Sequence, residues 1–160
     1  MGYRDTTAYK IANAIYENIK HYAPSDFFKN IKYHEVGIVP ALEEQNFPAL
    51  LVAAEVSTIL TRGITANHVY VYDVVITYIT KSKVNDINAV YEELENVDDV
   101  ILSTIEAETP TNFGLSSDYN ILFYPTVSIS NSFEVRDYPR MNETYVVYRT
   151  YTLRCEVMKE

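Results

Sequence analysis

The hydrophobic pattern is most distinctive between Asn67 and Thr80, where the sequence NHVYVYDVVITYIT is apolar at both odd and even positions. Successive side chains of a strand point to opposite faces of a sheet, so an antiparallel strand with one wet face alternates apolar and polar residues. Here, Val74 and Ile76 lie at even positions among tyrosines, while Ile79 and three valines lie at odd positions. This pattern predicts a strand covered on both faces, by helices, by another sheet or by another copy of the chain.

Two segments have apolar residues at helical spacing. The first ends before Pro24, because proline disfavours helical geometry in the residue that precedes it. The second either continues to about Ala107 or breaks near Asn96, and it carries its acidic residues opposite an apolar stripe. The expected N-terminal caps are Asp5 or Thr6 for the first helix and Asn85 or Asp86 for the second.

Strands account for most of the remaining pattern. The expected strands are Ala49–Leu60, Asn67–Thr80, Thr126–Arg136 and Thr144–Met158, with a short one near Tyr33–Val39. The alanines of Ala49–Leu60 leave a helix as the alternative there, and Gly63 would supply the turn of a hairpin. We expect residues 108–120 to form a long loop, and loops of this length in compact domains are often functional or mobile. The order of elements predicts one α+β domain over residues 1–160, an antiparallel sheet with two helices packed on one face.

The chain is acidic, with 13 Lys and Arg against 22 Asp and Glu and a formal net charge of −9. Affinity for DNA comes largely from Lys and Arg that displace counterions, so this composition disfavours DNA binding. An acidic composition suits a surface along which DNA moves without binding. The alternative is that the acidity serves solubility alone.

No catalytic or metal-binding motif is present. The three histidines lack the spacing of a metal site, and four glycines are too few for a phosphate-binding loop. The acidic runs Glu92–Glu95 and Asp98–Asp99 are interpreted as solvated helix surface, because neighbours on one helix do not form an acid–base pair. We therefore expect no enzymatic activity, no catalytic residue, no cofactor and no metal.

The single cysteine, Cys155, excludes an internal disulfide and fits a protein made in a reducing cytosol. Its place in an alternating strand predicts a small buried hydrophobe. No apolar run reaches the roughly 18–20 residues that span a bilayer, so no membrane association is expected.

Two charged residues interrupt apolar strand faces. Asp73 and Arg149 would each be costly to bury alone, because buried charges are normally paired. We expect the two side chains to meet, across adjacent strands or at a contact between subunits.

Tyrosine dominates the aromatic residues, with fifteen Tyr and no Trp. A tyrosine buries a large surface and keeps a hydroxyl that tolerates water, so it is enriched at interfaces. Tyr145 and Tyr151 share a strand face with aliphatic residues and are assigned to the core. Four others are candidates for either a subunit interface or the core: Tyr70, Tyr72, Tyr78 and Tyr148.

The order of these elements resembles the tail terminator proteins (also called tail completion or neck proteins) of long-tailed bacteriophages. The matching features are the capped N-terminal helix, the phrase FPALLVAAE at Phe47–Glu55, the returning strand HVYVYDVVITYI, an acidic second helix and two final long strands. The resemblance covers most of the chain and depends on architecture and short strand phrases. The 109–118 loop is longer than the family suggests.

The resemblance implies a structural virion protein, made in the host cytoplasm, that forms a six-membered ring of identical subunits on the tail tube. Such a ring ends tube growth and joins the tail to the head connector. Its partners would be further copies of the chain, the tail tube protein, and a connector or head completion protein, with DNA passing through unbound. Candidates for the channel rim are Glu43, Glu44, Glu106 and Glu108.

Three alternatives remain open at this stage. The chain could be another neck or tube protein of a phage, a small-ligand-binding α+β domain, or an enzyme of an unrecognised type. A ring subunit should leave a large apolar or aromatic surface bare in the single chain, whereas a ligand binder should enclose a cavity.

Overall fold

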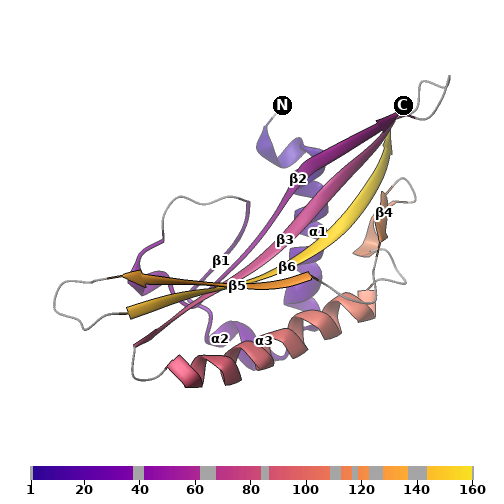
Figure 1. Ribbon diagram of the computed structural model, residues 1–160. Coiled ribbons are helices and arrows are strands. Elements are labelled where there is room, and N and C mark those ends of the chain that lie inside the picture. The colour runs from indigo at the N-terminus through magenta and orange to yellow at the C-terminus, as the bar shows by residue number, and fades with distance from the viewer. Residues whose placement is uncertain are drawn as a thin grey trace.

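A computed structural model describes residues 2–37, 42–61, 68–83, 87–108, 113–116, 119–122, 128–136 and 144–159 (Figure 1). Its helices are η1 (Tyr3–Asp5), α1 (Thr7–Tyr22), α2 (Ser25–Lys29), η2 (Glu44–Asn46) and α3 (Ile87–Glu108). Its strands are β1 (Tyr33–Val36), β2 (Ala49–Thr61), β3 (His68–Lys83), β4 (Tyr119–Leu122), β5 (Ser128–Arg136) and β6 (Thr144–Lys159).

The first helix begins at one of its two expected caps. The Thr6 hydroxyl accepts a hydrogen bond from the Tyr9 backbone N–H at 3.2 Å, which satisfies one of the free amides of the first turn. The helix α1 ends at Tyr22, before Pro24, as expected. The bounds of α3 agree with the second expected helix, whereas its expected caps and the Gly63 turn lie outside the described residues.

The six strands form one sheet in the order β1-β2-β3-β6, with β4 and β5 both on the far side of β6. The long strands β2, β3 and β6 are mutually antiparallel, and β4 and β5 are antiparallel to β6. Only β1, at the other margin, joins in parallel, through residues 33–36 opposite residues 49–52. The α+β class is therefore confirmed, and β1 makes the otherwise antiparallel sheet mixed.

The helices α1 and α3 cover one face of this sheet (Figure 1). Both contribute fully buried isoleucines, among them Ile15 of α1 and Ile101 of α3. The sheet contributes even-numbered residues of β3 and odd-numbered residues of β6, such as Ile76 and Tyr151, which are paired in register. Cys155 belongs to this core, as its position in the strand predicts.

The opposite face is covered at one end by the chain itself. Phe47, just before β2, packs in a second cluster with Ala49 of β2, Ile79 of β3 and Val146 of β6. The second apolar face of β3 thus has an intramolecular cover near residue 79. The strand is two-faced because a helix layer lies on one side and the segment before β2 lies on part of the other.

Candidate assembly surface

The three candidate tyrosines of β3 lie at even positions and point toward the helix layer. Tyr72 and Tyr78 are each only 4% exposed, and both belong to the core beneath the helices. Tyr70 is half-buried and packs against the same core. The interface prediction is therefore wrong for Tyr72 and Tyr78, because even-numbered positions of β3 point to the face that α1 and α3 cover.

The fourth tyrosine candidate lies on the opposite face. Tyr148 is half-buried and packs against the second cluster around Phe47. It is paired in register with Ile79 across β3 and β6. The four candidates are thus divided between two faces and do not form one aromatic contact surface.

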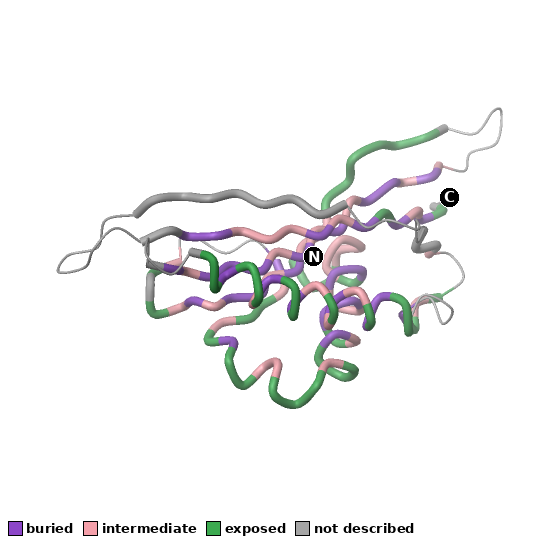
Figure 2. Tube along the Cα trace, turned by 60° about the horizontal axis from the view of Figure 1, so that its bottom comes forward, coloured by how far each residue is buried: buried purple, intermediate pink, exposed green. Residues whose placement is uncertain are grey.

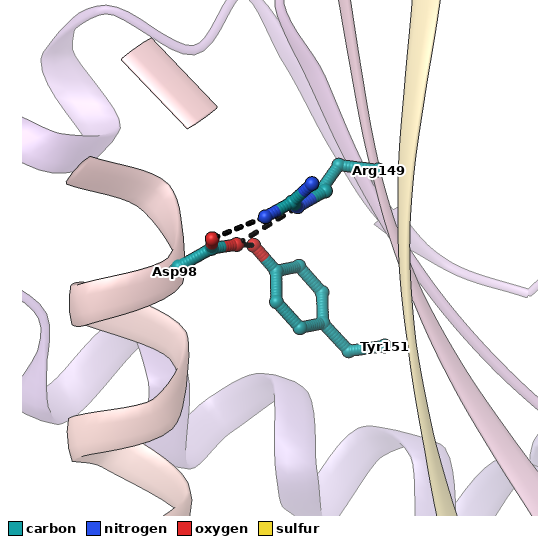
Figure 3. A network of polar contacts seen from close by, with 3 residues as sticks. All are labelled: Asp98, Arg149 and Tyr151. Carbon is teal, nitrogen blue, oxygen red and sulfur yellow. Dashed lines mark hydrogen bonds and ion pairs between the residues drawn. The ribbon is translucent and has the colours of Figure 1, made fainter. Parts of the chain in front are cut away.

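Asp73 and Arg149 do not pair within one chain, so the expected contact across adjacent strands is wrong. Arg149 points to the helix face, where its Nε donates a hydrogen bond to Oδ1 of Asp98 at 3.0 Å and its Nη2 pairs with Oδ2 of the same carboxylate (Figure 3). Asp73 lies at an odd position of β3, on the opposite face, in register with Arg154. Strand alternation separates the two side chains, since 73 on β3 and 149 on β6 belong to opposite faces.

Asp98 connects α3 to the sheet through two residues of β6. Its carboxylate also accepts a hydrogen bond from the hydroxyl of Tyr151 (Figure 3). The Asp98 and Arg149 side chains retain only 15% and 16% exposure. The hydrogen bond with Asp98 raises the pKa of Arg149, and burial, followed by the Asp98 hydrogen bond, raises the pKa of Tyr151.

A second carboxylate of α3 forms a similar connection to β3. Glu93 accepts hydrogen bonds from the Tyr78 hydroxyl at 2.5 Å and from the Thr80 hydroxyl at 3.1 Å. Burial, followed by the Glu93 hydrogen bond, raises the pKa of Tyr78. The interpretation of the α3 acids as solvated surface is therefore wrong for Glu93 and Asp98, which flank the apolar stripe, while Glu92, Glu95 and Asp99 are exposed.

The four channel-rim candidates occupy two separate places. Glu43 and Glu44 lie in the segment that leads into β2, and Glu106 and Glu108 lie at the C-terminal end of α3. Glu43 and Glu106 are exposed. A single chain does not bring the two pairs together, because the start of β2 and the end of α3 lie at opposite ends of the sheet (Figure 1).

A group of exposed apolar residues lies at the far end of the long strands. Six consecutive residues of β2, Glu55–Leu60, are exposed, and Figure 2 shows this half of the strand as a continuous exposed stretch at the margin of the molecule. Its apolar members are Val56 at 47%, Ile59 at 52% and Leu60 at 46% exposure, with Met158 of β6 at 53% nearby in the same end of the sheet. Sequence reasoning missed these residues, although the near absence of charge in Ala49–Leu60 was a usable signal.

Several open clefts lie among the described residues, and two of them are lined in part by residues of the sheet. One of about 280 Å³ lies between α2 and α3 and includes Phe27, Tyr78 and Glu93 in its lining. Another of about 450 Å³ lies where β1 ends beside β2 and includes Tyr3, Gly37 and Ala54. Within the described ranges, no group of His, Cys, Asp or Glu residues has the arrangement of a metal site.

One histidine has a specific partner. Nδ1 of His34 on β1 lies 2.5 Å from the Tyr16 hydroxyl of α1, and burial, followed by the charge of Lys20, lowers the pKa of His34. Tyr16 is itself 8% exposed and part of the core. The contact connects α1 to β1.

Comparison by sequence finds no matching protein-family model and no matching curated protein. Among the helices of the described residues, none combines the length and apolarity needed to cross a membrane.

Proposed function

We propose that this chain is a structural subunit of a closed, six-membered homo-oligomeric ring in the neck of a long-tailed bacteriophage, where the ring ends the tail tube and joins it to the head connector. The observation that carries the proposal is the bare end of the sheet, where Val56, Ile59 and Leu60 of β2 lie exposed. The ring and its partners follow from the resemblance in element order, which the α+β fold accommodates.

The exposed end of the sheet favours association with another protein chain. Contiguous exposed apolar residues on a soluble protein mark interaction sites more often than solitary ones do. The side chains of Val56, Ile59 and Leu60 remain 46–52% exposed in the single chain, although Val69 and Val71 of the neighbouring strand β3 are buried. Contact with another copy would remove them from water.

The surface charge is compatible with a channel for DNA. The outer side of α3 exposes Glu92, Glu95, Asp99 and Glu106, and the whole chain carries a formal net charge of −9. A wall of the same sign as DNA offers no site at which the polyanion is held. In the proposal, the polyanion passes through the ring without stable contacts.

The ligand-binding alternative has weaker support. The two clefts are open to solvent: the one between α2 and α3, about 280 Å³, is just below the usual size of ligand pockets, and the one beside β1, about 450 Å³, is within it. Neither encloses a cavity within the core. Another neck protein of a phage would also form a ring, and it would differ from a tail terminator in its position in the virus particle.

Negative-stain electron microscopy of the purified protein, alone and mixed with the tail tube protein of the same virus, tests the proposal. We expect rings of about six subunits with a central channel, and caps of the same diameter at one end of the tubes. Single-chain particles under both conditions would contradict the proposal. Rings that form but leave the tubes uncapped would instead favour a head completion protein.

A further inference from the structure

The strand β2 has one long unpaired edge. On the side away from β3, β1 pairs only with Ala49–Val52, and Gly37, whose N–H donates to the Val52 carbonyl at 2.7 Å, ends this pairing with a φ of 112°. The remaining nine residues, Ala53–Thr61, have no second partner strand among the described strands. We call these nine residues the β2 edge segment.

This edge segment lacks most of the features that protect strand edges. Natural edge strands are usually short, or carry lysine, proline or inward-pointing charges. The β2 edge segment contains no proline and no lysine, and its one charged residue is Glu55. A bulge between Val56 and Thr58 interrupts the register, yet regular pairing to β3 resumes from Thr58 to Thr61.

An open cleft adjoins the beginning of the segment. The cleft of about 450 Å³ lies beside Ala53 and Ala54, at the place where β1 would continue if it were longer. The small alanine side chains leave room for close approach of another backbone. Alternate residues of an antiparallel strand point both their N–H and their C=O away from the existing partner, so this edge offers hydrogen-bonding groups to a newcomer.

The same sheet ends in a different edge on its other side. The strands β4 and β5 both pair with β6, and neither pairs with another of the described strands. The nine residues of β5 match the nine of the β2 edge segment in length. Each copy thus carries two unlike edges, as a head-to-tail contact requires.

We propose that copies of this chain join by strand addition, the β4–β5 edge of one copy pairing with the β2 edge segment of the next. This inference rests on the proposed function, which it specifies by naming the contact that builds the ring. Main-chain hydrogen bonds supply the attraction, and Val56, Ile59 and Leu60 become covered. Because the two edges differ, each added copy leaves one of each kind free, and growth stops only when the ring closes.

Hydrogen–deuterium exchange of assembled and single-chain protein, read by mass spectrometry, tests this contact. We expect slower exchange on assembly in residues 53–61 and also in strand β4 or β5, with the outer side of α3 around Tyr91 unchanged. Rings whose β2 edge segment exchanges as fast as in the single chain would overturn the inference and leave the proposed function standing. Protection of β2 without β4 or β5 would indicate a two-fold β2–β2 contact and would also overturn it. If no assembled particle forms, both proposals fail.

Two lysine substitutions separate an edge contact from a contact through one face. Ile59 and Leu60 point to opposite faces of the sheet, being in register with Tyr70 and Val69 of β3. We expect both Ile59→Lys and Leu60→Lys to raise the concentration for half-assembly by about tenfold or more. The matched control is Tyr91→Lys, at an equally exposed apolar residue of α3, which should assemble as the native chain does. If only one of the two variants weakens assembly, the copies dock through one face of the sheet, and strand addition is overturned. Circular dichroism verifies that each variant folds.

Discussion

At the scale of single residues, two carboxylates attach α3 to the sheet. Asp98 accepts hydrogen bonds from Arg149 and Tyr151 of β6, and Glu93 accepts hydrogen bonds from Tyr78 and Thr80 of β3. Each carboxylate lies beside the apolar stripe of the helix. It accepts hydrogen bonds from hydroxyl or guanidinium groups on side chains of the sheet. Buried polar groups cost free energy unless they are paired, so these two residues stabilise one orientation of the helix.

Replacing Asp98 should destabilise the fold more than replacing its exposed neighbours. Asp98→Ala leaves the mostly buried Arg149 and the Tyr151 hydroxyl without their acceptor, and we expect the free energy of unfolding to fall by about 2–4 kcal/mol. Glu95→Ala on the exposed side of α3 is the control and should change it by less than about 0.5 kcal/mol. Urea denaturation measures both. Equal effects would show that Asp98 contributes no more than surface charge.

The two buried tyrosine hydroxyls predict a loss of stability in alkali. In the folded chain the pKa values of Tyr78 and Tyr151 are raised above the ordinary value of about 10, so both remain protonated while the unfolded chain ionises. Their contribution is complete below about pH 10 and is lost above it, by about 1.4 kcal/mol per pH unit for each tyrosine. Urea denaturation at a series of alkaline pH values measures this slope.

Replacing one of these tyrosines by phenylalanine tests whether the two hydroxyls cause the alkaline loss of stability. Tyr78→Phe should make the alkaline loss of stability shallower, because one titrating group has been removed. The control is Tyr91→Phe, at a residue that is 51% exposed, which should keep the original slope. An unchanged slope in Tyr78→Phe would show that other groups cause the alkaline transition.

At the scale of elements, periodicity predicted the long helices and strands well. The bounds of α1 and α3 and of the strands β2, β3, β5 and β6 agree with the sequence to within a few residues. The short elements α2 and β4 were missed, because five and four residues are too few to display a period. The parallel pairing of β1 was not predicted either, since a single short strand carries no signal for its direction.

The site was harder to predict than the fold, for a definite physical reason. Alternation along β3 separates its side chains into two sets, but it does not say which set the helices cover. Both sets are apolar, so the tyrosine set could have faced outward. The structure places Tyr72 and Tyr78 inward, and the same alternation places Asp73 and Arg149 on opposite faces.

The cap of α1 gives a test at this scale. Thr6→Ala removes the oxygen that accepts the Tyr9 N–H, and we expect the free energy of unfolding to fall by about 1 kcal/mol. Thr6→Ser keeps the hydroxyl and should retain most of the stability. Thermal or urea denaturation of the two variants measures the difference. A Thr6→Ser variant as unstable as Thr6→Ala would show that the hydroxyl is not the stabilising group.

At the scale of the whole molecule, the sheet is unevenly covered. Helices cover one face, and the segment around Phe47 covers one end of the other. The far end of β2 is exposed, and its outer edge beyond Val52 has no partner strand in the described residues. In the proposed assembly, copies of the same chain complete this sheet.

The mass of the purified protein particle tests that claim most directly. Native mass spectrometry across a range of protein concentrations should show a closed species of about six chains, near 110 kDa from a chain of 18.4 kDa, with few larger species because a ring leaves no free edge. The Ile59→Lys variant should shift this mass toward the single chain. A native protein that stays at 18.4 kDa at every concentration, alone and with tail tubes, would contradict the account.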